Sequence, residues 1–322
     1  MFQVSVIVLT YYPDADKLYQ TLLAAAGQKD VRFEIIVSDD GSHSPLISRL
    51  PAIFSDLGIG DYQIIENPEN VGTVKNCLGA IRAARGEYVF LTSPGDYLFD
   101  ELVLADFYRH AEENGAKLSF GNAVYYRQDG EAPVITRSHT GPYRPEMFCS
   151  DGITAETRAH FFGNNWVIGA SYFRKKETAL QYFEAICDHS IYVEDNTSTA
   201  FALADGIPLS YFDRNIVWYE DGTGVSTGSG DKWKARIAQD VSRSYTALQI
   251  LHPKDPYVDY AVNERRISQR LKRILCQLIR HPVIFLRIQV GKRLSKRKAV
   301  ICRPEDMAYL QQLCEQKFTA KE

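Results

Sequence analysis

Hydroxyl and carboxylate side chains that could bind a ligand occur in three short stretches of the sequence, residues 10–13, 38–42 and 92–96. Asp39 in the second stretch and Asp96 in the third supply carboxylates, which accept N–H and O–H groups and are preferred ligands of hard cations. The second stretch, with Asp-Asp-Gly-Ser at 39–42, by itself also fits a turn that caps the next helix. The combination of the three stretches indicates a site for a polar ligand.

Alternating strand and helix patterns must position these stretches. Apolar, β-branched runs predict strands, and apolar residues at helical spacing predict the helices between them. The expected strands are 4–9, 33–37, 62–66 and 88–91, and the expected helices are 14–28, 45–57 and 73–84. Such units form a mostly parallel sheet with helices on both faces, and ligands bind at the carboxyl ends of its strands. Because each polar stretch follows an expected strand, the three should converge at one edge.

The rest of the chain is expected to complete this α/β fold and then become helical. The expected elements are a helix at 101–114, strands at 117–126 and 167–173, a helix at 194–204 and a strand at 209–212. A polar, glycine-rich stretch at 220–230 is typical of a mobile loop that closes the globular body. Residues 231–322 are expected to be a helical C-terminal extension.

Basic residues are concentrated in that extension. The segment 265–303 has 13 Lys and Arg and no Asp or Glu, whereas residues 1–264 carry a net charge of −14. A body that binds nucleic acid needs positive charge to neutralise phosphates, and the basic segment has few of the aromatic residues that stack on bases. Nucleic acid is therefore not an expected partner.

The basic segment also has apolar residues at helical spacing, among them Ile267, Leu271, Leu275 and Leu278. A basic amphipathic helix binds an anionic membrane surface. The alternative is that its apolar face packs on the acidic body. No apolar run reaches the roughly 18 residues that span a bilayer, and the six scattered cysteines favour a reducing compartment. We expect a cytoplasmic protein, peripheral on the inner face of the membrane.

Four motifs follow one another along the body. They are VSVIVLTYY at 4–12, IIVSDDGS at 35–42, NVGTVKN at 70–76 with ARGEY at 84–88, and VED at 193–195. In this order and spacing the sequence resembles the inverting glycosyltransferases of family 2 over roughly residues 1–226. The resemblance implies a GT-A fold at 1–230, with a Rossmann-like nucleotide-sugar-binding half at 1–100 and an acceptor half at 101–230. The extension at 231–322 follows it.

The resemblance assigns donor binding to the edge of the sheet. Asp39 would accept the N–H of a uracil ring and Thr10 would lie near the ribose, which favours a UDP-sugar. Tyr12 and Lys75 are the further donor-binding residues that it implies, with Lys75 a base that reaches the nucleotide. As a residue type, Lys75 also fits a solvated helix position.

The resemblance also implies a divalent metal, Mg²⁺ or Mn²⁺, held against the diphosphate by a D-x-D cluster. The matching stretch is Ser93-Pro94-Gly95-Asp96, which keeps only the last carboxylate. One Asp can suffice because phosphate oxygens and water complete the coordination shell. Asp96 also fits a residue that caps a helix or stabilises a turn.

For catalysis, the resemblance makes Asp195 the base that deprotonates the acceptor hydroxyl, with Glu194 orienting the acceptor or raising the basicity of Asp195. Acids that cap a helix N-terminus are the alternative. Trp166, Trp218 and Tyr219 offer flat apolar faces on which an acceptor sugar could stack, although large aromatic residues also fill cores.

Two hypotheses for the function follow. The first is an inverting glycosyltransferase that moves a sugar from a nucleotide-diphosphate donor to a saccharide or lipid-linked saccharide acceptor in surface polysaccharide synthesis. The second is a catalytically weak or inactive GT-A subunit of a polysaccharide assembly complex, which the reduced metal motif favours. A nucleotidyltransferase would need a glycine-rich basic loop after the first strand, where this chain has Tyr11-Tyr12-Pro13.

Overall fold

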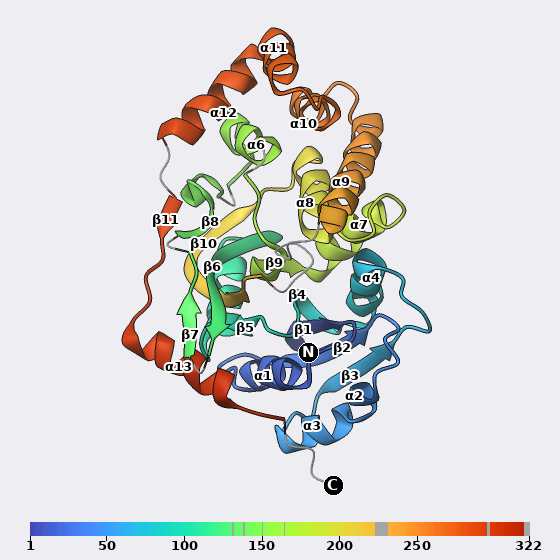
Figure 1. Ribbon diagram of the computed structural model, residues 1–322, viewed down its shortest axis with the longest axis vertical. Helices are drawn as coiled ribbons and strands as arrows, with labels where there is room; N and C mark the ends of the chain where they lie inside the picture. Colours follow the sequence, from blue (N-terminus) through green and yellow to red (C-terminus); the bar gives the residue numbers. More distant parts are fainter. Residues whose placement is uncertain are drawn as a thin grey trace.

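A single large sheet with helices on both faces forms the body of the molecule (Figure 1). The computed structural model describes residues 1–130, 132–137, 139–149, 151–163, 165–222, 231–294 and 297–318. The path through the sheet runs β3-β2-β1-β4-β9-β6-β10-β5, and β7 pairs with β6. The α/β class expected from the sequence is therefore confirmed.

The first half of the sheet is parallel throughout. Its strands are β1 (Phe2–Thr10), β2 (Phe33–Asp39), β3 (Tyr62–Glu66) and β4 (Gly86–Thr92). Its helices are α1 (Ala15–Ala26), α2 (Pro45–Ser48), α3 (Leu50–Asp56) and α4 (Thr73–Ala83). Continuous apolar runs such as Val4–Leu9 suit strands that are covered on both faces. This half matches the pattern expected from the sequence.

The second half of the sheet is mixed. Its strands are β5 (Tyr97–Leu98), β6 (Leu118–Asp129), β7 (Ala132–Ile135), β9 (Tyr172–Lys175) and β10 (Ser210–Glu220). Its helices are α5 (Val103–Glu113), α6 (Ala155–Phe162), α7 (Lys176–Ile186) and α8 (Glu194–Ala204), with 3-10 turns at Pro145–Met147 and Gly169–Ser171. β9 lies antiparallel between β4 and β6, while β10 runs parallel to β6.

Two of the expected strands in this half have different bounds. The expected strand at 167–173 begins only at Tyr172, because a 3-10 turn precedes it. The strand expected at 209–212 continues to Glu220. Its pairing with β6 includes a register shift between Tyr211 and Asn215, and such irregularities weaken the local strand pattern.

Each face of the sheet has its own hydrophobic core. Val6 of β1 packs in one core with Leu22 of α1 and Phe107 of α5. The next residue, Ile7, packs in the other core with Phe183 of α7. Alternate residues of a strand point to opposite faces, so one strand contributes to both cores.

The C-terminal extension completes these cores and is not a separate unit. It contains α9 (Asp231–Leu251), α10 (Pro256–Arg266), α11 (Arg270–Arg280), α12 (Pro282–Leu294), β11 (Arg297–Ala299) and α13 (Pro304–Glu315). Tyr245 of α9 is buried in the core that holds Ile7, and Leu310 of α13 is buried in the core that holds Val6. β11 pairs with β8 (His139–Tyr143). The expected boundary at residue 230, and residues 223–230 of the expected closing loop, lie outside the described residues.

Helices α11 and α12 lie at one end of the molecule, remote from the N-terminal strands (Figure 1). On α12, Ile284 and Ile288 are buried with Ala159 of α6. On α11 the apolar face points to solvent instead, and Leu271 and Ile279 are each 77% exposed. Packing on the body therefore accounts for part of α12 but not for the apolar face of α11. Among the described helices, none is long and apolar enough to cross a bilayer.

Candidate active site

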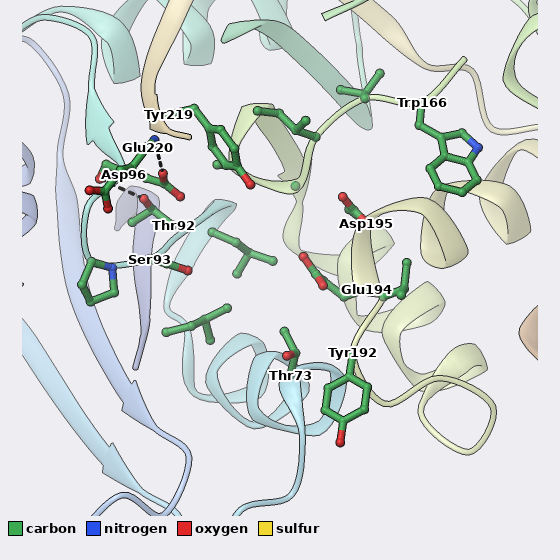
Figure 2. Close-up of a pocket in the computed structure, with 18 of the residues that line it drawn as sticks. Thr73, Thr92, Ser93, Asp96, Trp166, Tyr192, Glu194, Asp195, Tyr219 and Glu220 are labelled. Atoms are coloured by element: carbon green, nitrogen blue, oxygen red, sulfur yellow. Dashed lines mark hydrogen bonds between the residues drawn. The ribbon is translucent and has the colours of Figure 1, made fainter. Parts of the chain in front are cut away.

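A cavity of about 370 Å³ opens where the carboxyl end of β4, the end of β10 and the start of α8 meet. The polar and aromatic residues that line it include Asp96, Trp166, Glu194, Asp195, Tyr219 and Glu220. Figure 2 shows Asp96 and Glu220 on one wall and Glu194 and Asp195 on the opposite wall. The fold thus brings together carboxylates that are about a hundred residues apart in the sequence.

The first wall is built around Asp96, in the loop after β4. Its Oδ1 accepts the N–H of Glu220 at 3.1 Å. The Glu220 carboxylate is held in turn by Lys17 of α1, whose Nζ lies 2.7 Å from both Oε atoms. Burial raises the pKa of Asp96 to about 8, and the Glu220 charge adds to this, whereas the Glu220 N–H and Lys17 oppose it.

Glu220 was not among the predicted site residues, although it directly follows Tyr219 at the end of β10. The resemblance offered a signal, because it implies a basic residue or His after the matching Tyr, where this chain has Glu220. What the sequence does not show is the pairing with Lys17, which is 203 residues away.

Carboxylate oxygens of Asp96 and Glu220 at one cavity wall are the ligand type that Mg²⁺ and Mn²⁺ prefer. Within the described residues there is no cluster of three or more His, Cys, Asp or Glu that could hold a metal. These two carboxylates suit a divalent ion that takes the rest of its shell from a bound diphosphate and water, and the assignment of the metal to Asp96 stays a prediction.

The second wall is the first turn of α8, which carries Glu194 and Asp195. The preceding loop is held by Asp240 of α9, which accepts the N–H groups of Ile191, Tyr192 and Val193. Asp240 was not predicted, and it orients the turn that presents the two carboxylates. The predicted pair lies both in the cavity and in the first turn of α8. This placement fits a role in chemistry, and it also fits the alternative of acids at a helix N-terminus.

Gly169 makes room for this pair. A Cβ at Gly169 would lie 2.8 Å from Oε1 of Glu194 and 3.4 Å from Oδ2 of Asp195. The Asp195 carboxylate also accepts the main-chain N–H groups of Gly169 and Asn196. A larger residue at this position would make the Glu194 carboxylate shift.

The pKa values of the two carboxyls on the second wall are raised. Burial raises the pKa of Glu194 to about 8, and the neighbouring Asp195 charge adds to it. Burial also raises the pKa of Asp195, against main-chain hydrogen bonds and the positive charge of Arg174. Two adjacent carboxyls in a cavity share protons, so the pair can accept or release a proton near neutral pH.

The predicted donor-binding residues other than Asp96 lie outside this cavity. Thr10 Oγ1 donates to Asp39 Oδ1 at 2.9 Å, at the ends of neighbouring strands β1 and β2. Asp39 also accepts the N–H and Oγ of Ser42. Tyr12 and Lys75 are exposed. None of these four predicted residues lines the cavity of about 370 Å³.

Asp40, after β2, fixes the main chain that leads into α4. Its carboxylate accepts the N–H groups of Val71 and Gly72, which directly precede α4. Gly72 has φ 86° and lies against Ile191, whose Cγ2 would be 2.5 Å from a Cβ. A side chain at Gly72 would be both strained and too close to Ile191. The edge that carries Asp39 and Asp40 at the end of β2, called the donor edge below, therefore packs directly against the loop before α8.

Of the three predicted acceptor-binding aromatic residues, two line the cavity. Trp166 is 38% exposed, and Tyr219 projects into the cavity from β10 (Figure 2). Arg265 of α10 lies over the Trp166 ring at 5.6 Å. The extension therefore supports the cavity wall.

The prediction for Trp218 is wrong. Its side chain is 0% exposed, its ring stacks on Phe99 at 4.5 Å, and its Nε1 donates to the Phe99 carbonyl. Because β10 continues to Glu220, Trp218 and Tyr219 point to opposite faces. Trp218 belongs to the core and cannot contact a sugar.

Comparison with known families identifies the fold and its activity. The model of the family described as Glycosyl transferase family 2 matches residues 5–175, more than half of the chain. The chain belongs to this family. It is a glycosyltransferase with the GT-A fold, as the sequence motifs indicated. No curated protein sequence matches it.

Solved structures of other glycosyltransferases share this fold. TarS residues 1–349 from S. aureus, in complex with UDP, is 14% identical with a TM-score of 0.57, covering 97% of this chain and 90% of that chain. A TarS complex with UDP-GlcNAc is 16% identical with a TM-score of 0.56, covering 85% and 73%. The mannosyltransferase PcManGT from Pyrobaculum calidifontis, with GDP-Man and Mn²⁺, is 14% identical with a TM-score of 0.53, covering 98% and 88%.

Proposed function

We propose that this family 2 glycosyltransferase moves a sugar with inversion from a UDP-sugar to a saccharide or lipid-linked saccharide of a surface polysaccharide. One observation carries the proposal. A single cavity has the Asp96–Glu220 wall facing the Glu194–Asp195 wall, so a leaving group and an acceptor hydroxyl can be served from opposite sides. Inversion requires this arrangement, because the nucleophile attacks the face opposite the leaving group.

In the proposed reaction, the Glu194–Asp195 pair accepts the proton of the acceptor hydroxyl as that oxygen attacks the anomeric carbon. Asp195 is the proposed base and Glu194 orients the acceptor. Burial raises the pKa values of both carboxyls, which makes their anions stronger bases. Trp166 and Tyr219 form the faces against which the acceptor sugar packs.

The donor is proposed to bind along the carboxyl ends of β1, β2 and β4, with the base and ribose near Asp39 and Thr10. Tyr12 and the exposed Lys75 are placed at the same edge and would contact the nucleotide. The neighbours in complex with UDP and UDP-GlcNAc support a uridine nucleotide, and the neighbour with GDP-Man is the reason to test a guanosine one.

A divalent ion, when bound, would neutralise charge on the departing diphosphate. Asp96 and Glu220 would hold it. The Mn²⁺ in the PcManGT complex supports a divalent ion in a protein of this fold. Lys17 competes for Glu220. The variant D96A should lose any stimulation of donor hydrolysis by Mn²⁺, whereas full wild-type activity in chelator would contradict the metal proposal.

Helices α11 and α12 are proposed to bind the anionic surface that holds a lipid-linked acceptor, which places the enzyme on the inner face of the membrane. Their exposed apolar residues are Leu271, Leu275, Leu278, Ile279, Val283, Leu286 and Val290. Arg270, Lys272, Lys292 and Arg293 are exposed on the same two helices. Each base near the surface contributes about 1 kcal/mol, screened over roughly 8 Å at physiological salt.

Vesicle sedimentation tests this surface on the full chain. Wild type should sediment with anionic vesicles and much less with neutral ones, and salt should weaken the binding. The triple variant L271S/L275S/I279S should lose it. The control I250S/L251S removes exposed apolar residues from α9 and should bind as wild type does. Equal partitioning of wild type into both vesicle types would contradict the electrostatic proposal.

A donor screen tests the proposed activity itself. Release of nucleotide from UDP-, GDP- and dTDP-sugars would be measured with and without Mn²⁺. We expect turnover of a UDP-sugar. UDP binding without any turnover, with or without candidate acceptors, would instead favour the inactive-subunit hypothesis.

A further inference from the structure

A buried arginine lies in the centre of the sheet, behind the second wall of the cavity. Arg174 is on β9, opposite Val89 of β4 and Leu118 of β6. Its side chain is 2% exposed, although it carries a permanent charge. Arginine is rarely buried this completely unless it is paired.

The terminal nitrogens of Arg174 have no hydrogen-bond partner within the described part of the chain. Both Nη1 and Nη2 are buried without an acceptor. The guanidinium lies over the rings of Tyr172 and Phe183, 4.2 and 5.7 Å from their centroids. Such contacts contribute less than the several kcal/mol that removing the charge from water costs. Stability of the fold does not explain this arginine.

A small cavity joins Arg174 to helix α8. It measures about 10 Å³ and is lined by Arg174 together with Thr178 of α7 and Ser198 and Thr199 of α8. That is close to the smallest cavity that can hold one water molecule, about 10–15 Å³. Thr199 lies one helical turn beyond Asp195, and its hydroxyl lies against that of Tyr172. Arg174 and the helix that carries the carboxylates thus line the same cavity.

The charged and titratable groups around Arg174 come from three elements. They are Glu194 and Asp195 of α8, Tyr172 of β9 and Cys77 of α4. Asp240 of α9 acts on Glu194 in the opposite sense and raises its pKa further. The Arg174 charge lowers the pKa of both carboxyls and so opposes the effect of their burial. No ion pair in the described ranges joins Arg174 to either carboxylate, so the effect acts over a distance.

We propose that Arg174 is a positioning residue whose buried charge keeps the Glu194–Asp195 pair negatively charged, so that it can take the acceptor's proton. This inference rests on the proposed function. It explains why a guanidinium without partners is retained in the core, since the charge serves the pair and not the fold. Lysine at this position would preserve the charge, and an apolar residue would remove it.

The pH dependence of kcat at saturating donor tests the proposal. In R174M the midpoint of the rising limb should move upward, and turnover at pH 7 should fall about tenfold for each pH unit of that shift. R174K should restore the midpoint towards the wild-type value. R82M replaces an exposed, ion-paired arginine of α4 and should leave the profile unchanged.

Thermal stability separates this role from a structural one. Methionine suits the apolar surroundings and removes a desolvated charge, so R174M should unfold at the same temperature as wild type or higher. An unshifted pH profile together with a lower Tm would overturn the proposal. If R174M does not fold, R174Q takes its place, and an unshifted profile in that variant overturns the proposal equally.

A second readout does not depend on the reaction. Because the folded pKa of Glu194 is raised to about 8, the stability that it contributes is lost as pH rises towards that value. In R174M this loss should extend to higher pH, and coinciding curves would overturn the proposal. A wild type without transfer or donor hydrolysis would instead refute the proposed function, so the two failures are distinguishable.

Discussion

Carboxylates have different surroundings at the donor edge, where they accept several hydrogen bonds, and in the cavity, where they are buried. Asp39 accepts Thr10 and both donors of Ser42, and Asp40 accepts the main-chain N–H groups that directly precede α4. In the described part of the chain Asp195 accepts the main-chain N–H groups of Gly169 and Asn196, and burial raises the pKa values of both Glu194 and Asp195. The first pair of carboxylates fixes the loops around it through hydrogen bonds, whereas the second pair faces the cavity.

The aromatic residues show the same contrast. The indole N–H of Trp218 has a main-chain acceptor and the ring has a stacking partner, so the residue serves the core. Trp166 presents its ring to the cavity. Side chains whose partners are supplied by the fold stabilise it, and those left facing the cavity are available for chemistry.

Replacing the proposed base should have the largest effect on activity. D195N should keep donor binding and reduce transfer by about 10²- to 10⁴-fold, because the pair loses its proton acceptor. Steady-state kinetics and calorimetry with UDP would measure the two properties. E184Q, on the exposed end of α7, is the control. Near-normal transfer by D195N would move the base to Glu194.

The two tryptophans should respond in opposite ways. W218A should lower the free energy of unfolding by about 3–5 kcal/mol, as truncation of a buried aromatic residue does. W166A should leave stability within about 0.5 kcal/mol of wild type and raise the KM for the acceptor. Denaturant titration and acceptor kinetics check these results. A stable W218A protein would contradict its assignment to the core.

Loss of the Asp39 carboxylate should affect binding and fold together. D39A should weaken UDP binding by about 1.5–3 kcal/mol, the contribution of a hydrogen bond to a charged group. It should also lower Tm, because Thr10 and the Ser42 N–H lose their acceptor. Calorimetry and thermal unfolding measure the two effects. Unchanged UDP affinity would exclude Asp39 from the nucleotide site.

The smallest effect concerns pH and stability. Burial raises the pKa of Asp96 to about 8, above its unfolded value of 3.8, so its protonated form is favoured by folding. The corresponding stability is complete below the unfolded pKa and is lost as pH rises through about 8. D96N removes this titration, so its Tm should fall less than that of wild type between pH 6 and pH 9. Parallel curves would show that Asp96 titrates normally.

Much of the fold was readable from the sequence because it depends on local pattern. Apolar runs and helical spacing identified the four parallel strands and their helices, and the residues after each strand marked the ligand edge. Helix α8 was expected at 194–204 and spans Glu194–Ala204. The basic, amphipathic character of the segment containing α11 was equally a local property.

Other features of the site depend on contacts between distant parts of the chain. Trp218 was misassigned because the irregular register of β10 concealed the length of the strand, and strand length decides which face each residue occupies. The contact of Lys17 with Glu220 and the support of the α8 turn by Asp240 join elements far apart in sequence.

The sequence by itself determined the α/β fold and the family and indicated candidate residues for catalysis, because strand and helix periodicity and motif spacing are properties of the chain. Only the tertiary structure decided how those residues behave. Burial and hydrogen-bond partners set whether a carboxylate titrates, whether an aromatic ring meets a ligand and whether a buried arginine acts on a site. These depend on which side chains pack together, and local sequence does not specify that.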